Sequence, residues 1–441
     1  MMKSGFAQVC LHGEDRISFD MGGMFLHYEP EGLHTPLYAS AWGLEAGSTK
    51  AIWVSADIIL FDEEAVRRIR RDVAGRTGLS PEHILVSATH THTGPNTANV
   101  SVFHPAGDQG YLEPIYAKVA DACALAWRRR EPVRMGCASA NAEKCGFNRR
   151  WIMKNGESRM HPGGPENSER LAKEGPDDNL LTVAWFENES GPVGVIANIS
   201  GHPSGMYGMH VVSADYPGVL RRTVQGAFGD IPVLFLLGFS GNTTNIDHGR
   251  DASWGAGIDG AERVGKILGA HAIRLMAGTR LGERDSDLSA SIATGGVAMP
   301  YRCLSQGDIE SAERTIKAFN SPDHAAIELA DLAFANKVKV LEKKRAEGDS
   351  DWFALNALRL GDALFLTCPS EIFVEFQLSL KERFPDLHVI CASITNGWHN
   401  YIPTRQAYLL GGYETSQGLY DWRGGYMIEE ELARLGKMGE A

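Results

Sequence analysis

The sequence predicts an α/β fold in which mixed sheets are covered by helices. Segments typical of buried strands alternate with amphipathic helical segments along the N-terminal third, and the same alternation returns in the second half of the chain. The composition agrees, since 43% hydrophobic and 22% charged residues are ordinary for a globular protein and exclude a wholly disordered or fibrous chain.

The N-terminal third supplies two strand–helix pairs. The first strand is expected over residues 50–61, because this apolar run is rich in β-branched residues. In the helix that follows, Glu63 and Arg67 lie four positions apart on one face, and Gly75 and Gly78 are expected to end it. A second strand and a second helix are expected at 83–89 and 116–130.

The middle of the chain predicts a long loop followed by further strands and helices. The polar segment 148–178 contains Asn155-Gly156 and Gly175-Pro176 and is expected to be a loop. Compact domains seldom carry a loop of this length unless it has a function, such as covering a site. Strands are then expected at 180–186, 193–198 and 233–239, with helices at 219–228 and 260–278.

The C-terminal part completes the same pattern. Segment 308–348 is mostly helical, and 352–369 predicts a hairpin with Gly361-Asp362 at its turn. A helix is expected at 370–384 and a strand at 387–394. Because no internal repeat, low-complexity tract or linker marks a boundary, residues 1–441 are expected to form one large domain.

Charge and cysteine content exclude several classes of function. With 43 Lys and Arg against 55 Asp and Glu, the net charge of −12 disfavours nucleic acid and anionic membrane surfaces as partners. No apolar run approaches the roughly 20 residues of a membrane span, so no membrane insertion is expected. The N-terminus has no signal-peptide pattern, and the seven scattered cysteines form no CxxC. A reducing cytoplasm is therefore the expected location.

The strongest chemical signal is a pair of histidines directly after a predicted strand. His90 and His92 lie at positions i and i+2 in the segment Ser87–Pro95, so their side chains are expected on the same face. Imidazole is a common metal ligand near neutral pH. The pattern fits a metal site, and it also fits paired polar histidines at a strand end.

Three weaker signals follow other strands. His202 comes after the strand at 193–198, the loop 238–245 lies at the end of the strand at 233–239, and Glu371 comes after the predicted hairpin. Two of them have an ordinary alternative: His202 could be a loop histidine that binds no metal, and Glu371 could be a residue that stabilises the start of a helix. The loop lacks the lysine of a phosphate-binding P-loop. Because open α/β sheets gather their sites at the carboxyl ends of strands, the shared position points to one site.

Taken in order, these segments resemble a known family. The motifs SATHTHTGP, NISGHP, SADYPG, GFSGNTTN, CPSE and NGWHNYIPT are similar to those of the neutral (non-lysosomal) ceramidases, specifically their large metal-bearing N-terminal domain. The resemblance covers nearly the whole chain. It implies a single ceramidase-like catalytic domain over residues 1–441, without the C-terminal immunoglobulin-like domain of the family.

The resemblance also implies a role for individual residues. One Zn²⁺ per chain is expected, with the metal ligands His90, His202, Glu371 and Tyr401. Two imidazoles, a carboxylate and a phenol suit zinc, which lowers the pKa of a bound water to about 7 and polarises a carbonyl. Substrate contact and support of the reaction centre are implied for His92, Arg149 and Tyr413.

One segment departs from the family pattern. Where the family typically has Gly-Asp-Val-Ser-Pro-Asn, this chain has the segment Gly241–Ile246 with the sequence GNTTNI. Counted from the glycine, Thr244 takes the place of the serine implicated in ceramide hydrolysis; counted back from Asn-Ile, Thr243 does. A position of Thr244 far from the metal would weaken the amidase hypothesis.

The leading hypothesis is a zinc-dependent hydrolase that cleaves an amide bond in a small polar substrate, since ceramide itself resides in membranes. The alternatives are a metalloenzyme acting on a sugar, ester or lactone, as a hydrolase or lyase, and a non-catalytic binding protein. A small molecule is the expected partner. The choice between zinc and manganese stays open, and so does a homo-oligomeric state.

Overall fold

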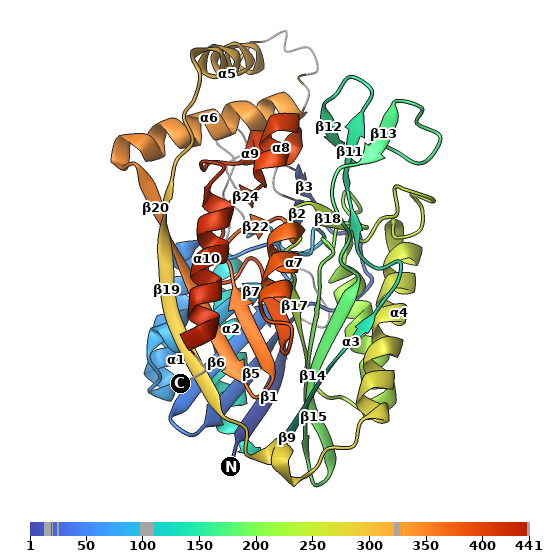
Figure 1. Cartoon of the computed structure of the whole chain (residues 1–441), viewed down its shortest axis with the longest axis vertical. Helices are drawn as coiled ribbons and strands as arrows, with labels where there is room; N and C mark the ends of the chain where they lie inside the picture. Colours follow the sequence, from blue (N-terminus) through green and yellow to red (C-terminus); the bar gives the residue numbers. More distant parts are fainter. Residues whose placement is uncertain are drawn as a thin grey trace.

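The computed structural model describes residues 1–12, 19, 21–23, 26–97, 110–321, 327 and 329–438. In this part of the chain three larger sheets, each with parallel and antiparallel neighbours, pack together with helices around them (Figure 1). The predicted α/β class is therefore confirmed. None of the helices described has the length and apolar character that a membrane crossing requires.

The first sheet has the strand order β7-β6-β5-β1-β8. Its strands are β1 (Lys3–Cys10), β5 (Tyr38–Ala46), β6 (Thr49–Ala56), β7 (Ile84–Ala88) and β8 (Glu131–Pro132). Helices α1 (Glu63–Thr77) and α2 (Leu112–Arg128) pack against each other, and α2 covers one face of the sheet. Helix α1 continues through Gly75 and ends at Gly78, which adopts a left-handed φ of 73°. The predicted stop at Gly75 is therefore wrong.

The second sheet has the order β17-β15-β14-β9. Its strands are β9 (Arg134–Asn141), β14 (Leu180–Asn188), β15 (Gly191–Ile199) and β17 (Val233–Leu237). Helices α3 (Asp215–Phe228) and α4 (Gly257–Gly278) pack along each other on this side of the molecule (Figure 1). Strands β15 and β17 run parallel, so the loops after them leave the sheet at the same edge.

The third sheet has the order β19-β20-β21-β23. Its strands are β19 (Ala290–Pro300), β20 (Ser350–Leu360), β21 (Ala363–Thr367) and β23 (His388–Ala392). The predicted hairpin is confirmed as β20–β21, with its turn at Gly361. Helices α7 (Val374–Arg383) and α10 (Gly424–Lys437) flank this sheet, whereas α5 (Gln306–Phe319) and α6 (Leu329–Glu347) project beyond it between β19 and β20 (Figure 1).

One aromatic core joins the three sheets. The Trp42 ring on β5 lies 5.3 Å from the Phe186 ring on β14 and 5.6 Å from the Phe365 ring on β21, measured between centroids. All three side chains are buried. Contacts between large aromatic rings are among the strongest packing interactions in a core, so they hold the three sheets in a fixed relation.

Short elements complete the fold around the strand ends. They are β2 (Met21–Gly23), β3 (Leu26–Tyr28), β4 (Gly32–Leu33), β10 (Phe147–Asn148), β11 (Arg150–Met153), β12 (Ser158–Met160), β13 (Arg170–Lys173), β16 (Val211–Val212), β18 (Thr243–Thr244), β22 (Glu371–Ile372), β24 (Tyr401–Ile402), α8 (Arg405–Leu410), α9 (Tyr413–Gln417) and the 3₁₀ turns η1 (Pro81–His83) and η2 (Glu283–Ser286).

The segment 148–178 is not the continuous loop that its polar composition predicts. It contains the three-stranded antiparallel sheet β12-β11-β13. Asn155-Gly156 is the turn between β11 and β12, with Gly156 at a φ of 86°. An Asn-Gly pair between two short strands is a strong hairpin signal, because both turn residues tolerate positive φ. The strands themselves are too short to show alternation.

Glu371 is also placed differently from the prediction. It lies in the two-residue strand β22, and helix α7 begins only at Val374. Strand β22 pairs in parallel with β24, so that Glu371 is opposite Tyr401 in the register. A helix-stabilising role for Glu371 is therefore wrong, because the carboxylate belongs to a strand pair that ends in the centre of the molecule.

Candidate metal centre

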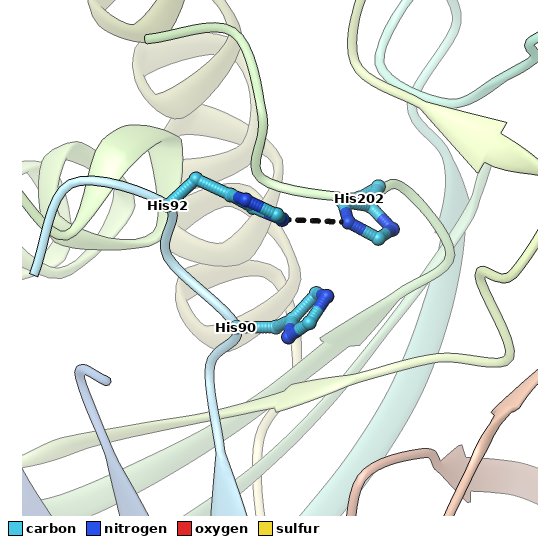
Figure 2. A group of neighbouring side chains, drawn as sticks. All are labelled: His90, His92 and His202. Atoms are coloured by element: carbon cyan, nitrogen blue, oxygen red, sulfur yellow. Dashed lines mark hydrogen bonds between the residues drawn. The ribbon is translucent and has the colours of Figure 1, made fainter. Parts of the chain in front are cut away.

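Three histidines from two sheets meet at one point. His90 and His92 follow β7, and His202 follows β15. Ring centroids lie 4.9 Å apart for His90 and His92, 4.4 Å for His90 and His202, and 5.0 Å for His92 and His202 (Figure 2). One ligand atom from each ring lies within 4.8 Å of the others, which is close enough for a shared metal ion.

His90 is oriented as a metal-binding imidazole would be. Its Nδ1 lies 2.6 Å from the carbonyl oxygen of Ile59. Because a carbonyl only accepts, Nδ1 carries the proton and Nε2 keeps its lone pair. This Nε2 is buried without a hydrogen-bond partner in the described structure. A backbone carbonyl that binds the far nitrogen is the usual support of a ligating histidine. His90 itself adopts a φ of 64°, a rare conformation for a residue with a side chain.

Glu371 directs a carboxylate oxygen at the same point. The side chain is completely buried, and Trp398 donates its indole N–H to Oε1 over 2.9 Å. Oε2 has no hydrogen-bond partner among the described residues and lies 3.5 Å from Nε2 of His90 and 3.9 Å from Nδ1 of His202. Burial acts to raise the pKa of Glu371, but the interactions with His90 and hydrogen bonds from Tyr401 and Trp398 lower it to about 2. The carboxylate is therefore charged.

His202 and His92 form a hydrogen-bonded pair. Their Nε2 atoms lie 2.9 Å apart, and Nδ1 of His202 is buried and unpartnered within the described chain. Burial, followed by the proximity of the His90 ring, holds the pKa of both rings well below the usual range. Neutral imidazoles can offer lone pairs to a metal.

The donor set fits a divalent cation. His90 Nε2, His202 Nδ1 and Glu371 Oε2 are three buried polar atoms that face one another without forming hydrogen bonds among the described residues. Such groups normally have partners, because an unpaired buried polar atom costs roughly 1–3 kcal/mol. A cation between them would satisfy all three. His92 lies beside this set and orients His202 through their mutual bond.

Tyr401 and Arg149 form the adjoining wall. Tyr401 is opposite Glu371 in the β22–β24 pair, and Arg149 donates to its hydroxyl over 3.2 Å. Arg149 also donates to Glu414 and to the Gly241 carbonyl, each over 2.9 Å. Burial and the charge of Glu371 raise the pKa of Tyr401, so the phenol keeps its proton.

Glu414 was not anticipated from the sequence. Its second carboxylate oxygen accepts a hydrogen bond from Arg150 over 2.5 Å, so it joins two consecutive arginines. The adjacent Arg149-Arg150 pair, both buried, implies a buried acidic partner, but the sequence does not show which of many acidic residues it is.

A cavity of about 540 Å³ opens beside the metal centre. This volume lies within the range of roughly 300–1,000 Å³ that is typical of small-molecule sites. Five expected site residues line it, namely His92, Arg149, His202, Tyr401 and Tyr413. Sequence reasoning did not single out the other polar or aromatic lining residues, which are His161, Ser204, Tyr207 and His248.

Thr244 lies behind the cavity wall rather than on it. Its side chain is completely buried on β18, and its hydroxyl accepts from the Ile246 N–H over 3.3 Å and lies 3.5 Å from the Ser204 hydroxyl. Ser204 and Ile246 line the cavity in its place. Thr244 also adjoins the proposed ligand His202 through a backbone bridge, so it is not far from the metal centre. A direct role of Thr244 in the reaction stays a prediction from the resemblance.

Comparison with known proteins bears on the fold. No family model matches the sequence. A solved structure described as a ceramidase complexed with C2 is similar with a TM-score of 0.71 and 17% identity, covering 100% of this chain and 75% of that chain. The neutral ceramidase from Pseudomonas aeruginosa is similar with a TM-score of 0.69 and 16% identity, covering 100% and 74%. The chain thus has the fold of the neutral ceramidases, as its ordered motifs predict.

Proposed function

We propose that this protein is a zinc-dependent hydrolase that cleaves an amide bond in a small polar substrate. His90, His202 and Glu371 would hold the metal, with Tyr401 as the fourth ligand. The observation that carries the proposal is the set of three unpartnered, buried donor atoms that face one another beside a cavity. Zn²⁺ in such a site supplies Lewis-acid activation of a carbonyl group and of water.

The chain's own residues would bind the substrate and move protons. Arg149 stays charged, because Tyr401, Glu414 and Glu371 raise its pKa more than burial lowers it, and it would bind a carbonyl or anionic oxygen of the substrate. Tyr413 stays protonated, since burial and the charge of Glu371 raise its pKa, so its hydroxyl would donate to the oxyanion that develops on the carbonyl. His92 is neutral, so it would first take a proton from the attacking water and then pass it to the departing amine.

The lining of the cavity combines polar groups with a surface that is mostly apolar. Nine of the fourteen lining residues carry polar side-chain atoms, and five do not. Desolvating these groups without hydrogen-bonding partners on the ligand would be costly. A compact amide that carries both polar groups and some apolar surface would suit this lining, whereas an alkyl chain placed against the polar groups would leave them unsatisfied. The cytoplasmic location and the single-domain organisation stay predictions from the sequence.

Hydrolysis of an ester or lactone is the second candidate. The position of Thr244 behind the wall favours it, because the residue in the serine slot of the motif does not line the cavity. An alkoxide leaves more readily than an amine, so ester cleavage needs less assistance from additional groups. A purely binding role has no such support. It gives no reason to keep the charged carboxylate of Glu371 buried beside two imidazoles that each have one unpartnered nitrogen.

Metal analysis combined with a paired substrate screen tests the proposal. Purified protein is expected to contain about one zinc per chain. Short-chain N-acyl amides and the matching esters would be assayed with the metal-loaded protein, with chelator-treated protein, and after zinc is restored. Activity on amides that is lost with zinc and regained with it supports the proposal. Full activity of the metal-free protein would refute the proposal.

A further inference from the structure

A second pair of histidines lies in the cavity outside the metal centre. Nδ1 of His161 is 2.6 Å from Nε2 of His248, and the two ring centroids are 4.8 Å apart. His161 follows strand β12 and His248 follows strand β18, and both rings line the cavity with the metal centre. Neither residue belongs to the motifs that carry the resemblance to the ceramidases.

The pair offers one donor and one acceptor to a ligand. Two neutral imidazoles carry two N–H groups, and one of these is used between the rings. The remaining N–H therefore lies on either Nε2 of His161 or Nδ1 of His248, and the other nitrogen keeps a lone pair. Among the described residues the His161 side chain bonds only to His248. Nδ1 of His248 is buried and forms no hydrogen bond of good geometry with the described part of the chain, although the Gly163 backbone is close enough to raise the pKa of His248.

The surroundings keep both rings neutral. Burial is the main cause that lowers the pKa of His161 well below its usual range, and the nearby charge of Arg149 adds to it. Burial also lowers the pKa of His248 to about 4. A neutral pair carries no charge that would attract an anion, and its single free lone pair is too few donors to hold a metal ion. A hydroxyl group, which both donates and accepts, matches it in either tautomer.

The backbone holds His161 in a conformation that the sequence disfavours. Its φ is 46°, and the following Pro162 restricts the preceding residue to extended conformations. The strain is held by a hydrogen bond of 3.1 Å from the His161 N–H to the carbonyl oxygen of Arg149. Strained residues of this kind are costly and concentrate at functional sites. His90 is strained in the same way on the metal side of the cavity.

We propose that His161 and His248 form a hydroxyl-binding subsite, which makes polyhydroxylated amides the preferred ligands of the cavity. This inference rests on the proposed function for the amide, and on the imidazole pair for the hydroxyl groups. The pair would select substrates, because an analogue without hydroxyl groups leaves the outer nitrogens of the pair, Nε2 of His161 and Nδ1 of His248, without partners.

A matched pair of ligands tests the subsite. N-acetyl-D-glucosamine and N-acetylcyclohexylamine both carry an acetamide on a six-membered ring, but only the first carries hydroxyl groups. Their dissociation constants would be measured by calorimetry with zinc-loaded wild-type protein and with His248→Phe, which keeps an aromatic ring and removes both nitrogens. His248→Gln retains a donor and an acceptor. His83→Phe, at a histidine in η1 before the start of β7, is the control.

The wild-type protein is expected to bind the sugar amide at least about tenfold more tightly than the cyclohexyl amide. His248→Phe is expected to weaken sugar binding about tenfold, leaving cyclohexyl binding and zinc content unchanged, and His248→Gln to recover part of the loss. If His248→Phe does not fold, His161→Leu takes its place. Equal wild-type affinities, no sugar binding, or equal losses for both ligands would overturn the inference.

Hydrolysis separates this inference from the proposed function. Acetate release from both amides would be measured with the same proteins. If the sugar amide binds through the histidine pair and neither amide is cleaved, the subsite is supported while the amidase proposal fails. If both amides are cleaved with the same kcat/KM by the wild-type protein and by His248→Phe, the amidase proposal stands and the subsite is refuted.

Discussion

Replacement of Glu371 by glutamine is the sharpest test of the metal centre. The change keeps the shape of the side chain and leaves an oxygen to accept the Trp398 N–H, so that mainly the charge is lost. In the structure this charge lies 3.5 Å from the unpartnered Nε2 of His90 and 3.9 Å from Nδ1 of His202. Glu371→Gln therefore removes the one anionic donor from a site built of neutral imidazoles.

A lower bound on the effect follows from the charge that is lost. A unit negative charge about 4 Å from only one unit of positive charge already contributes roughly 4 kcal/mol at an effective dielectric constant of about 20, and Zn²⁺ carries two units. Because about 1.4 kcal/mol corresponds to a factor of ten, zinc affinity is expected to fall by roughly a thousandfold or more in Glu371→Gln. The stabilisation of the fold by added zinc should shrink in parallel, since it depends on the ratio of free zinc to the dissociation constant.

Competition with a fluorescent zinc chelator measures the affinity, and thermal unfolding with and without zinc measures the stabilisation. Glu375→Gln is the matched control, because Glu375 lies four residues further on and accepts a hydrogen bond from Asn242 outside the metal centre. Unchanged zinc affinity in Glu371→Gln would refute the assignment of the carboxylate. An equal loss in Glu375→Gln would show that the effect is structural rather than due to a lost ligand.

Three further predictions test other parts of the site and the fold. His90→Ala is expected to lose zinc, whereas His92→Ala should keep zinc and lose turnover; identical behaviour in elemental analysis and assays would contradict the two roles. Thr244→Val is expected to keep turnover within about threefold and to lower stability by about 1 kcal/mol, because the buried hydroxyl accepts the Ile246 N–H; a loss of activity at full zinc content would instead restore Thr244 to the reaction. Burial raises the pKa of Asp215 from 3.8 to about 6, so the unfolded state loses this proton at a lower pH than the folded state does. The free energy of unfolding therefore falls as the pH rises from about 4 through about 6. Urea unfolding should therefore show Asp215→Asn gaining about 1–2 kcal/mol relative to the wild type between pH 5 and pH 7.5, and a constant difference would refute this.

Local sequence patterns were enough for the longer elements of this fold. The strands at β6, β7 and β15, the helix α1 and the hairpin β20–β21 all lie where hydrophobic runs, helical charge spacing and turn residues predict them. These signals are local, so they do not depend on the rest of the chain. The small sheet β12-β11-β13 was missed, because its strands of three or four residues are too short to show a period.

The candidate site likewise has a part that is visible in the sequence and a part that is visible only in the structure. Placement of His90, His92 and His202 after strands is visible in the sequence, and the ordered motifs added Glu371, Tyr401, Arg149 and Tyr413 through their resemblance to a family. Which atoms face one another is not visible there. The hydrogen bond between Ile59 and His90 and the strand pairing of Glu371 with Tyr401 join residues far apart in the chain.

By itself, then, the sequence determined the fold class, the principal strands and helices, and the candidate metal ligands. It could do so because hydrophobic periodicity and motif order are properties of the chain that do not depend on tertiary contacts. Only the tertiary structure decided that three donor atoms remain unpartnered around one point and that Thr244 lies behind the cavity wall. The hydrogen bond between His161 and His248 was likewise visible only there. Those facts depend on the packing of three sheets on one core, and burial, hydrogen-bond partners and charge at each side chain follow from that packing.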